Sequence, residues 1–179
     1  MRFIKLMILA SIVWSSATAS AEQWGVIAGT GSYMGDRHAG VALTTESQRH
    51  NVEFTFGHTP GILGEDVKQL NLKYVYSPFR SSYRGVATNW IGIGTMVSHC
   101  LCDETFYESP SQYPESNYYD ETEFRFGLVL SSMIQWKNFE AYFDWTLLDQ
   151  IAIAAVNNSE YAKQVKDIWA GGFGLRYFF

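Results

Sequence analysis

The last thirteen residues constrain the fold of this chain more than any other stretch. Counting back in twos from the end, one face of this segment is apolar apart from one glycine, and it carries Phe179, Tyr177, Leu175, Phe173, Gly171 and Trp169. The other face is small or polar except for one residue, and it carries Phe178, Arg176, Gly174, Gly172 and Ala170. A period of two indicates a β-strand with two unlike faces. A soluble edge strand would not usually end on two unprotected phenylalanines, because such an edge invites aggregation.

The opposite end of the chain predicts export. A basic start, Met-Arg-Phe-Ile-Lys, is followed by an apolar run from Leu6 to Trp14 and by Ala19-Ser20-Ala21. These are the three parts of a secretory signal peptide, and the apolar run is too short for a membrane-spanning helix. We therefore expect residues 1–21 to be a signal peptide of the Sec type, cleaved after Ala21, and residues 22–179 to form one domain.

The same alternation recurs along the chain and predicts eight strands. We expect them near residues 23–32, 39–46, 50–58, 67–77, 85–98, 121–136, 139–156 and the closing segment that ends at 179. Residues 59–66, with Pro60 and two glycines, are expected to form a loop, and residues 78–83 a turn. A short helix within residues 149–166 is an open alternative to extended strand.

The pattern favours an all-β fold, namely an eight-stranded antiparallel up-and-down transmembrane β-barrel. After the leader, no segment approaches the ~18 continuous apolar residues of a membrane helix, and closed barrels are the other structure that satisfies its backbone in lipid. The chain holds 12 Phe, 11 Tyr and 6 Trp, which suits a lipid-facing wall with aromatic girdles. Six aromatic residues are expected near one end of the barrel: Trp24, Trp90, Trp136, Phe139, Tyr177 and Phe179.

A soluble, lipocalin-like barrel with its apolar face inward is the rival interpretation, and periodicity alone does not separate the two. The terminal phenylalanine and the charged second face favour the membrane. A closing strand of this kind resembles that of small bacterial outer-membrane barrels with OmpX-like or OmpA-like architecture. The resemblance implies a place in the cell outer membrane, contact with outer-membrane lipid and lipopolysaccharide, and recognition of the strand ending at Phe179 by the barrel-insertion machinery.

Six charged residues share the predicted inner face: Glu53, Lys73, Arg125, Glu140, Asp144 and Arg176. The lumen of an eight-stranded barrel is too narrow for an open channel. Buried charges are very costly unless they are paired. We therefore expect these side chains to pair and fill the lumen, in preference to a conducting or catalytic interior.

The densest group of potential metal ligands is His99, Cys100, Cys102, Asp103 and Glu104. Zinc binds thiolate and imidazole, but a single residue between the two cysteines does not match the usual spacing. Two cysteines in an exported chain more often form a disulfide. A Cys100–Cys102 disulfide is therefore the first expectation, free thiols the second and a metal the third, and no cofactor is expected. A formal charge of −5 does not suggest a nucleic-acid partner.

Catalysis has one precedent in this architecture. In size and architecture the chain is similar to the lipid A 3-O-deacylases, barrels that hydrolyse an ester of lipopolysaccharide and carry a His-x-Ser pair on a late strand. None of the four histidines here has a serine two residues on, so that pair cannot be transferred. The remaining weak candidates are His58 and Ser98, both expected to face outward near the outer rim, two strands apart and too far for a hydrogen bond.

The sequence between 99 and 120 is rich in Ser, Pro, Tyr and acidic residues, and it predicts a long loop. Its aromatic residues are Phe106, Tyr107, Tyr113, Tyr118 and Tyr119. They could form a recognition surface, since aromatic rings supply contact area at a small entropy cost, or they could pack on themselves over the barrel mouth. The expected function is a non-enzymatic outer-membrane barrel with exposed loops and a structural or surface-interaction role. The alternative is a lipid A deacylase-like ester hydrolase, and a porin is a third idea.

Overall fold

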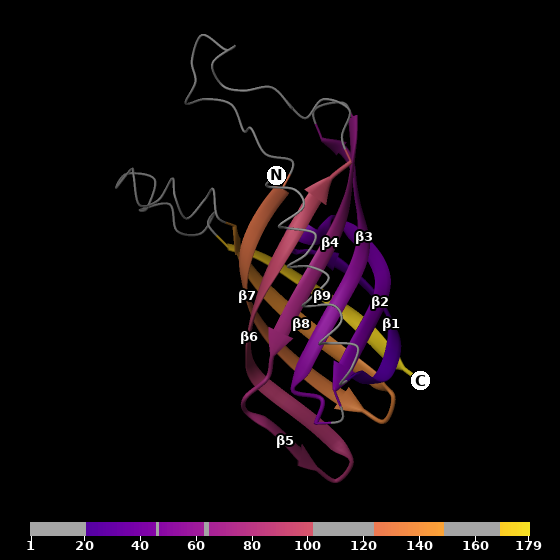
Figure 1. Cartoon of the computed structure of the whole chain (residues 1–179), viewed down its shortest axis with the longest axis vertical. Coiled ribbons are helices and arrows are strands. Elements are labelled where there is room, and N and C mark those ends of the chain that lie inside the picture. The colour runs from indigo at the N-terminus through magenta and orange to yellow at the C-terminus, as the bar shows by residue number, and fades with distance from the viewer. Residues whose placement is uncertain (1–20, 46, 63–64, 102–123, 149–168) are drawn as a thin grey trace, which may run out of the picture.

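A computed structural model describes residues 21–45, 47–62, 65–101, 124–148 and 169–179. It contains nine strands and one short 3-10 helix within these ranges (Figure 1). In chain order they are β1 (Ala21–Gly31), η1 (Ser32–Met34), β2 (Arg37–Thr45), β3 (His50–Ile62), β4 (Glu65–Tyr76), β5 (Arg80–Tyr83), β6 (Val86–Cys100), β7 (Phe124–Trp136), β8 (Phe139–Leu148) and β9 (Trp169–Phe178). No helix in the described part of the chain is long and apolar enough to cross a membrane.

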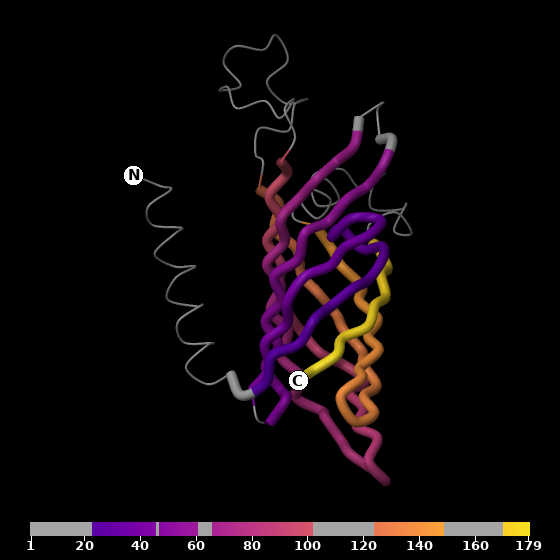
Figure 2. The backbone as a smooth tube through the Cα atoms, turned by 90° about the vertical axis from the view of Figure 1, so that its right-hand side faces the viewer, coloured from indigo at the N-terminus to yellow at the C-terminus, as the bar shows by residue number. Residues whose placement is uncertain are grey.

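The strands form one closed sheet. Their order is β4-β3-β2-β1-β9-β8-β7-β6-β5, and β4 also pairs with β6, which closes the ring and leaves β5 outside it. All neighbouring strands are antiparallel. Figure 2 shows the wall as a continuous tilted ribbon around a central axis. The predicted all-β, eight-stranded antiparallel closed barrel is therefore confirmed.

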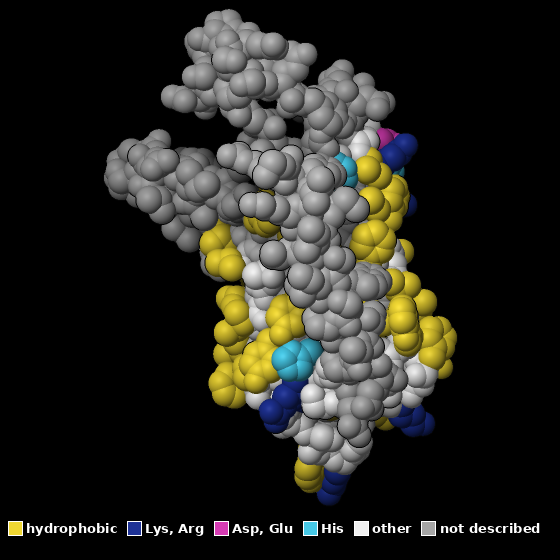
Figure 3. Space-filling view, in the orientation of Figure 1, with side chains coloured by type: hydrophobic (Ala, Val, Ile, Leu, Met, Phe, Trp, Pro, Cys, Tyr) yellow, Lys and Arg dark blue, Asp and Glu magenta, His cyan; other side chains and the backbone are white. Residues whose placement is uncertain are grey.

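Side chains alternate between the lumen and the outside along the regular parts of the barrel strands, as the pleat requires. On β8, Glu140, Tyr142 and Asp144 are buried, whereas Phe143 before Asp144 and Trp145 after it are exposed. The inner face is mostly polar, and the outer face is mostly apolar. Figure 3 shows hydrophobic side chains along both sides of the barrel, with Lys and Arg side chains gathered towards its two ends.

The two ends of the barrel differ in their connections. One end, here called the turn end, holds the start of β1, the end of β9 and the short β2–β3 and β7–β8 connections (Figures 1 and 2). The far end is the opposite one, where η1 follows β1. At the turn end, the backbone N–H of Phe179 donates to the carbonyl of Trp24 over 2.8 Å. The start of β1 and the end of β9 therefore lie side by side at the turn end.

The predicted loop at residues 59–66 is wrong. β3 continues to Ile62 and β4 begins at Glu65, and the two strands stay paired from Thr59 opposite Val67 to Ile62 opposite Glu65. A register irregularity lies between these pairs. It accommodates Pro60, which has no N–H for the sheet, because proline is tolerated at bulges and edges.

The predicted turn at residues 78–83 is correct only for residues 78 and 79. Residues 80–83 form β5, which pairs with the first part of β6 as a hairpin that extends beyond the turn end (Figure 1). Arg84 and Gly85 connect the two strands with φ values of 51° and 80°. Two positive φ values in a two-residue loop are the geometry of a type I′ hairpin turn. Residues 1–20 and 149–168 lie outside the described residues, so the signal peptide and the strand-or-helix alternative stay predictions.

Candidate functional site: the charged barrel interior

The barrel interior holds five charged side chains that contact one another. Lys73 Nζ lies 2.7 Å from Glu53 Oε2 and 2.6 Å from Asp144 Oδ2. Arg176 pairs with Glu53 through Nη2 and with Glu140 through Nη1. Each of these side chains is at most 2 % exposed. We call these five residues the ion cluster.

Strand register explains how the sequence assembles the ion cluster. Glu53 on β3 lies directly opposite Lys73 on β4, and Glu140 on β8 lies directly opposite Arg176 on β9. Directly opposed residues on one face of antiparallel strands are close enough to interact. The remaining pairs cross the lumen, because Lys73 reaches Asp144 on β8 and Arg176 reaches Glu53 on β3. The cluster therefore ties opposite walls of the barrel together.

Tyr142 completes the cluster between its two cations. Its ring lies 4.6 Å from Lys73 Nζ and 4.1 Å from Arg176 Cζ, measured to the ring centroid. Both distances suit cation–π attraction, which strengthens when the groups are desolvated. The Tyr142 hydroxyl and His38 Nε2 are hydrogen-bonded over 2.9 Å. His38 on β2 is buried too, so this contact extends the polar network to a fifth strand.

The connection between β1 and β2 enters the lumen at the far end. Met34 of η1 is 1 % exposed and packs with the buried residues Val75, Met96 and Val129. The backbone of η1 is held by the wall, because Asn71 Nδ2 donates to the Met34 carbonyl over 3.1 Å. An apolar group supported by amide hydrogen bonds therefore lies inside the barrel beside the ion cluster.

Arg80 of β5 closes the interior from the turn end. Its guanidinium donates to the side-chain carbonyls of Gln48 and Gln135 and lies 3.8 Å from Glu140 Oε2. Burial lowers the pKa of Arg80 below the usual arginine value, and the Glu140 carboxylate opposes that shift. The hairpin that the sequence pattern missed therefore brings a third cation close to one of the three interior carboxylates, Glu140.

This arrangement suits a sealed lumen. Three carboxylates (Glu53, Glu140 and Asp144) face three cations (Lys73, Arg80 and Arg176), so the formal charges balance. An ion that entered would have to break pairs between groups that have already lost their hydration, which is costly. The interior of an eight-stranded barrel is only wide enough for side chains to fill. Structural pairing is thus the chemistry that these residues support best.

The two weak catalytic candidates do not meet. Ser98 faces the lumen, contrary to the predicted outward orientation, and its hydroxyl donates to Asn71 Oδ1 over 2.7 Å. The prediction failed because counting placed this residue on the outer face, whereas the register of β6 shifts between Asn89 and Gly92. His58 on β3 lies 3.0 Å from Asp66 Oδ2, and β4 separates its strand from that of Ser98. These contacts form no serine–histidine pair.

The other predicted site residues lie either far from the ion cluster or outside the described residues. Arg125 lies opposite Ser98 near the far end of β7, about 20 Å along the strand from the position that faces Asp144. The binding-loop residues Phe106, Tyr107, Tyr113, Tyr118 and Tyr119 lie outside the described residues. Cys102 lies outside them as well, so its disulfide with Cys100 stays a prediction. Among the described residues, no group of three or more His, Cys, Asp or Glu side chains could hold a metal ion.

Sequence reasoning did not single out three members of this interior. Tyr142 shares the parity of Glu140 and Asp144, which is the signal that could have found it. His38 lies at the start of β2, before the segment whose alternation was clear. Arg80 was assigned to a turn, and only the hairpin register brings it to the lumen. No protein-family model, curated protein or solved structure matches this chain.

Proposed function

We propose that this protein is a non-enzymatic β-barrel of the bacterial outer membrane, with a sealed lumen and a structural or surface-interaction role carried by its exposed loops. The observation that supports this most is the inverted distribution of side chains. Charged groups are buried inside, while large apolar side chains such as Leu128 (58 % exposed), Phe173 (61 %) and Leu175 (59 %) face outward. A monomer in water rarely exposes a continuous apolar surface of this extent. A barrel in lipid requires it.

The turn end supports the same proposal. Trp24, Trp136, Phe139 and Phe179 are all at least half exposed there. Phe139, Tyr177 and Phe179 form a row of rings, with centroid distances of 4.8 and 5.5 Å between neighbours. Aromatic girdles of this kind lie at the two membrane interfaces of transmembrane barrels. The soluble lipocalin-like alternative requires the opposite placement of the two faces.

In this proposal, export precedes insertion. Residues 1–21 direct the chain across the inner membrane, and the barrel-insertion machinery recognises the strand that ends at Phe179. Outer-membrane lipid and lipopolysaccharide then surround the barrel, and the turn end faces the periplasm. The balanced charges of the ion cluster and Arg80 support a role without ion conduction.

Residues 22–179 refolded into phospholipid vesicles test the proposal. A closed barrel should migrate differently on a denaturing gel before and after boiling, and single molecules in a planar bilayer should show no conductance above background. A folded protein that stays soluble without detergent would refute the membrane location. Steady channel currents would refute the sealed lumen.

The ester-hydrolase alternative has a separate test. Lipid A from cells with and without the protein is compared by mass spectrometry. The proposed function requires identical acyl chains in the two samples. Loss of one acyl chain only in cells that contain the protein would show an enzyme and refute the non-enzymatic role.

A further inference from the structure

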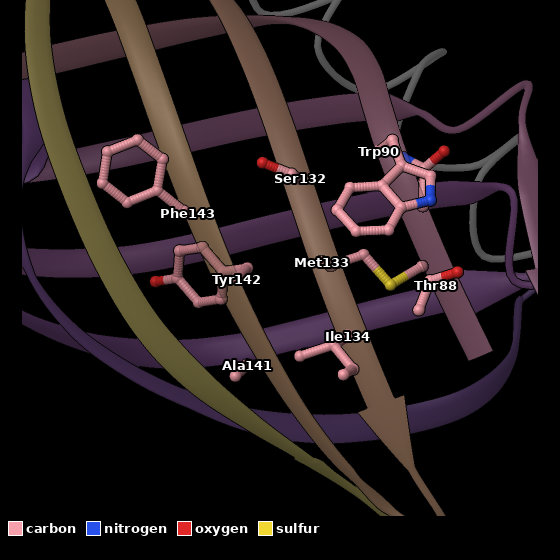
Figure 4. Close-up of a pocket in the computed structure, with 9 residues that line it drawn as sticks. Thr88, Trp90, Ser132, Met133, Ile134, Ala141, Tyr142 and Phe143 are labelled. Atoms are coloured by element: carbon pink, nitrogen blue, oxygen red, sulfur yellow. The ribbon is translucent and has the colours of Figure 1, made fainter. Parts of the chain in front are cut away.

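The outer wall of the barrel carries a hollow of about 350 Å³ over β6, β7 and β8. Figure 4 shows the side chains around it. Two small outward residues, Ser132 on β7 and Ala141 on β8, leave space between the larger side chains of Trp90, Ile134 and Phe143. The lining contains no charged side chain.

An irregularity in the sheet forms one side of this hollow. The pairing of β6 with β7 shifts register between Asn89 and Gly92. Both of these residues are buried, while Trp90 and Ile91 between them are 75 % and 51 % exposed. A bulge of this kind points two successive side chains to one face. Trp90 therefore stands out from the wall beside the hollow.

Two cations lie at the turn end of the hollow. Ile134 and Trp136 share the outer face of β7, and Lys137 follows with its ammonium 4.6 Å from the Trp136 ring centroid. Trp136 pairs with Val86, the first residue after the Arg84–Gly85 turn, and the Arg84 guanidinium lies over the Tyr83 ring, 5.2 Å from its centroid. Basic and aromatic groups are therefore adjacent at this rim, about 16 Å along the strand from Ser132.

The chemistry along this strip is asymmetric. The hollow is apolar, and its turn end is cationic. Glu140 and Asp144 are the acidic residues of the β7–β8 hairpin in the described chain, and both point into the lumen. An occupant that matches both parts of the strip has an apolar tail and an anionic head. Long basic side chains reach from an apolar wall to the level of lipid head groups.

We propose that this strip is a binding site for one anionic diacyl phospholipid, with an acyl chain in the hollow and the phosphate between Arg84 and Lys137. The inference rests on the proposed membrane location, since only a lipid-facing wall presents the hollow to acyl chains. Beyond that location, the site specifies which class of lipid binds and where on the barrel it binds. The turn end lies at the membrane surface in that location, so the head group and the cations are at the same depth.

The test measures lipid retention by native mass spectrometry. Wild-type protein in detergent receives either dioleoyl phosphatidylglycerol or dioleoyl phosphatidylcholine at equal concentration. We expect one phosphatidylglycerol to be retained with about thirtyfold preference, from two cations near an anionic head group. Equal retention of the two lipids by the wild type would refute the proposal.

Two variants separate the head-group and tail contacts. The double variant Arg84→Gln/Lys137→Gln should lose the preference for phosphatidylglycerol, because both cations of the proposed head-group site are removed. Ala141→Phe should lose retention of both lipids, because the added ring fills the hollow. An unchanged preference for phosphatidylglycerol in the double variant would overturn the site. Unchanged lipid retention in Ala141→Phe would overturn it as well.

Matched controls lie elsewhere on the same barrel. Arg49→Gln removes a cation at the β2–β3 turn, and Val41→Phe enlarges an outward side chain of β2. Both should retain phosphatidylglycerol as the wild type does, and a loss equal to that of the test variants would refute a local site. Heat-modifiable migration of each variant reports barrel formation independently. Folded barrels without lipid preference would refute this site alone, whereas a wild type that fails to form a barrel in lipid would refute the membrane location.

Discussion

Replacing Lys73 by methionine tests the ion cluster most directly. The ammonium lies within 2.7 Å of carboxylate oxygens from both Glu53 and Asp144, and its side chain is 1 % exposed. Methionine fills similar space without charge. The variant therefore leaves three interior carboxylates facing two cations, and the burial of these side chains makes the surplus charge costly. Breaking a buried pair in this way costs about 3–5 kcal/mol of unfolding free energy.

The second half of the experiment removes the anion as well. Asp144→Leu alone should cost a similar amount, because it leaves a surplus cation. The double variant Lys73→Met/Asp144→Leu restores neutrality, and an apolar replacement of a buried ion pair is often neutral or stabilising. We expect it to be no less stable than either single variant. The loss of unfolding free energy in the double variant would then be smaller than the sum of the two single losses by about 3 kcal/mol. This value is at the upper end of coupling energies between contacting residues.

The assay is urea-induced unfolding in phospholipid vesicles, followed by tryptophan fluorescence. Lys68→Met is the control, because Lys68 is an exposed lysine of the same strand. It should change stability by no more than about 0.5 kcal/mol. Additive losses in the double variant, or a loss below about 1 kcal/mol for Lys73→Met, would refute the view that paired buried charges hold the interior.

Three further predictions address other contacts of the barrel. Tyr142→Phe should lower the unfolding free energy by about 1–3 kcal/mol, because His38 Nε2 loses its buried partner; stability equal to the wild type in the same urea titration would contradict this. Met34→Ala should cost about 2–5 kcal/mol by opening a cavity, and planar-bilayer recordings should still show background current, because the ion cluster stays intact; channel activity would show that the methionine alone seals the lumen. Removal of Phe179 should reduce the amount of folded barrel recovered in the outer-membrane fraction. Phe173→Ala, on the same face of the strand, should not reduce it. Equal recovery of the two variants would show that the terminal residue has no special role in insertion.

Much of the barrel could be predicted because strands such as β8 alternate over long stretches without interruption. On β8 the alternation runs unbroken from Phe139 to Leu148, so parity alone assigns Glu140 and Asp144 to the lumen. The same counting assigned Lys73 and Arg176 correctly to the inner face. Periodicity of two is a strong signal wherever the two faces differ in polarity.

The remaining features depend on contacts between distant strands. Pro60 and Gly61 indicate a loop locally, but pairing with β4 extends the strand through them to Ile62. The β6 bulge moves Ser98 to the lumen, and the sequence carries no local mark of it apart from Gly92 and Gly94. The position of Arg80 follows from a hairpin whose positive φ at Arg84 is unusual for a residue other than glycine. Each of these outcomes is decided by tertiary pairing, which local propensity does not encode.

The origin of the ion cluster in the chain has a consequence for the timing of assembly. Glu53 and the arginine that pairs with it are separated by 123 positions, and that arginine belongs to the final strand. Until β9 joins β1 and β8, strands β3 and β8 present Glu53 and Glu140 without Arg176, the cation that they share. A partly assembled wall therefore carries surplus negative charge where lipid or neighbouring strands would have to cover it. Closing the barrel and neutralising its interior then occur in one step, and we expect partly closed forms to be poorly populated.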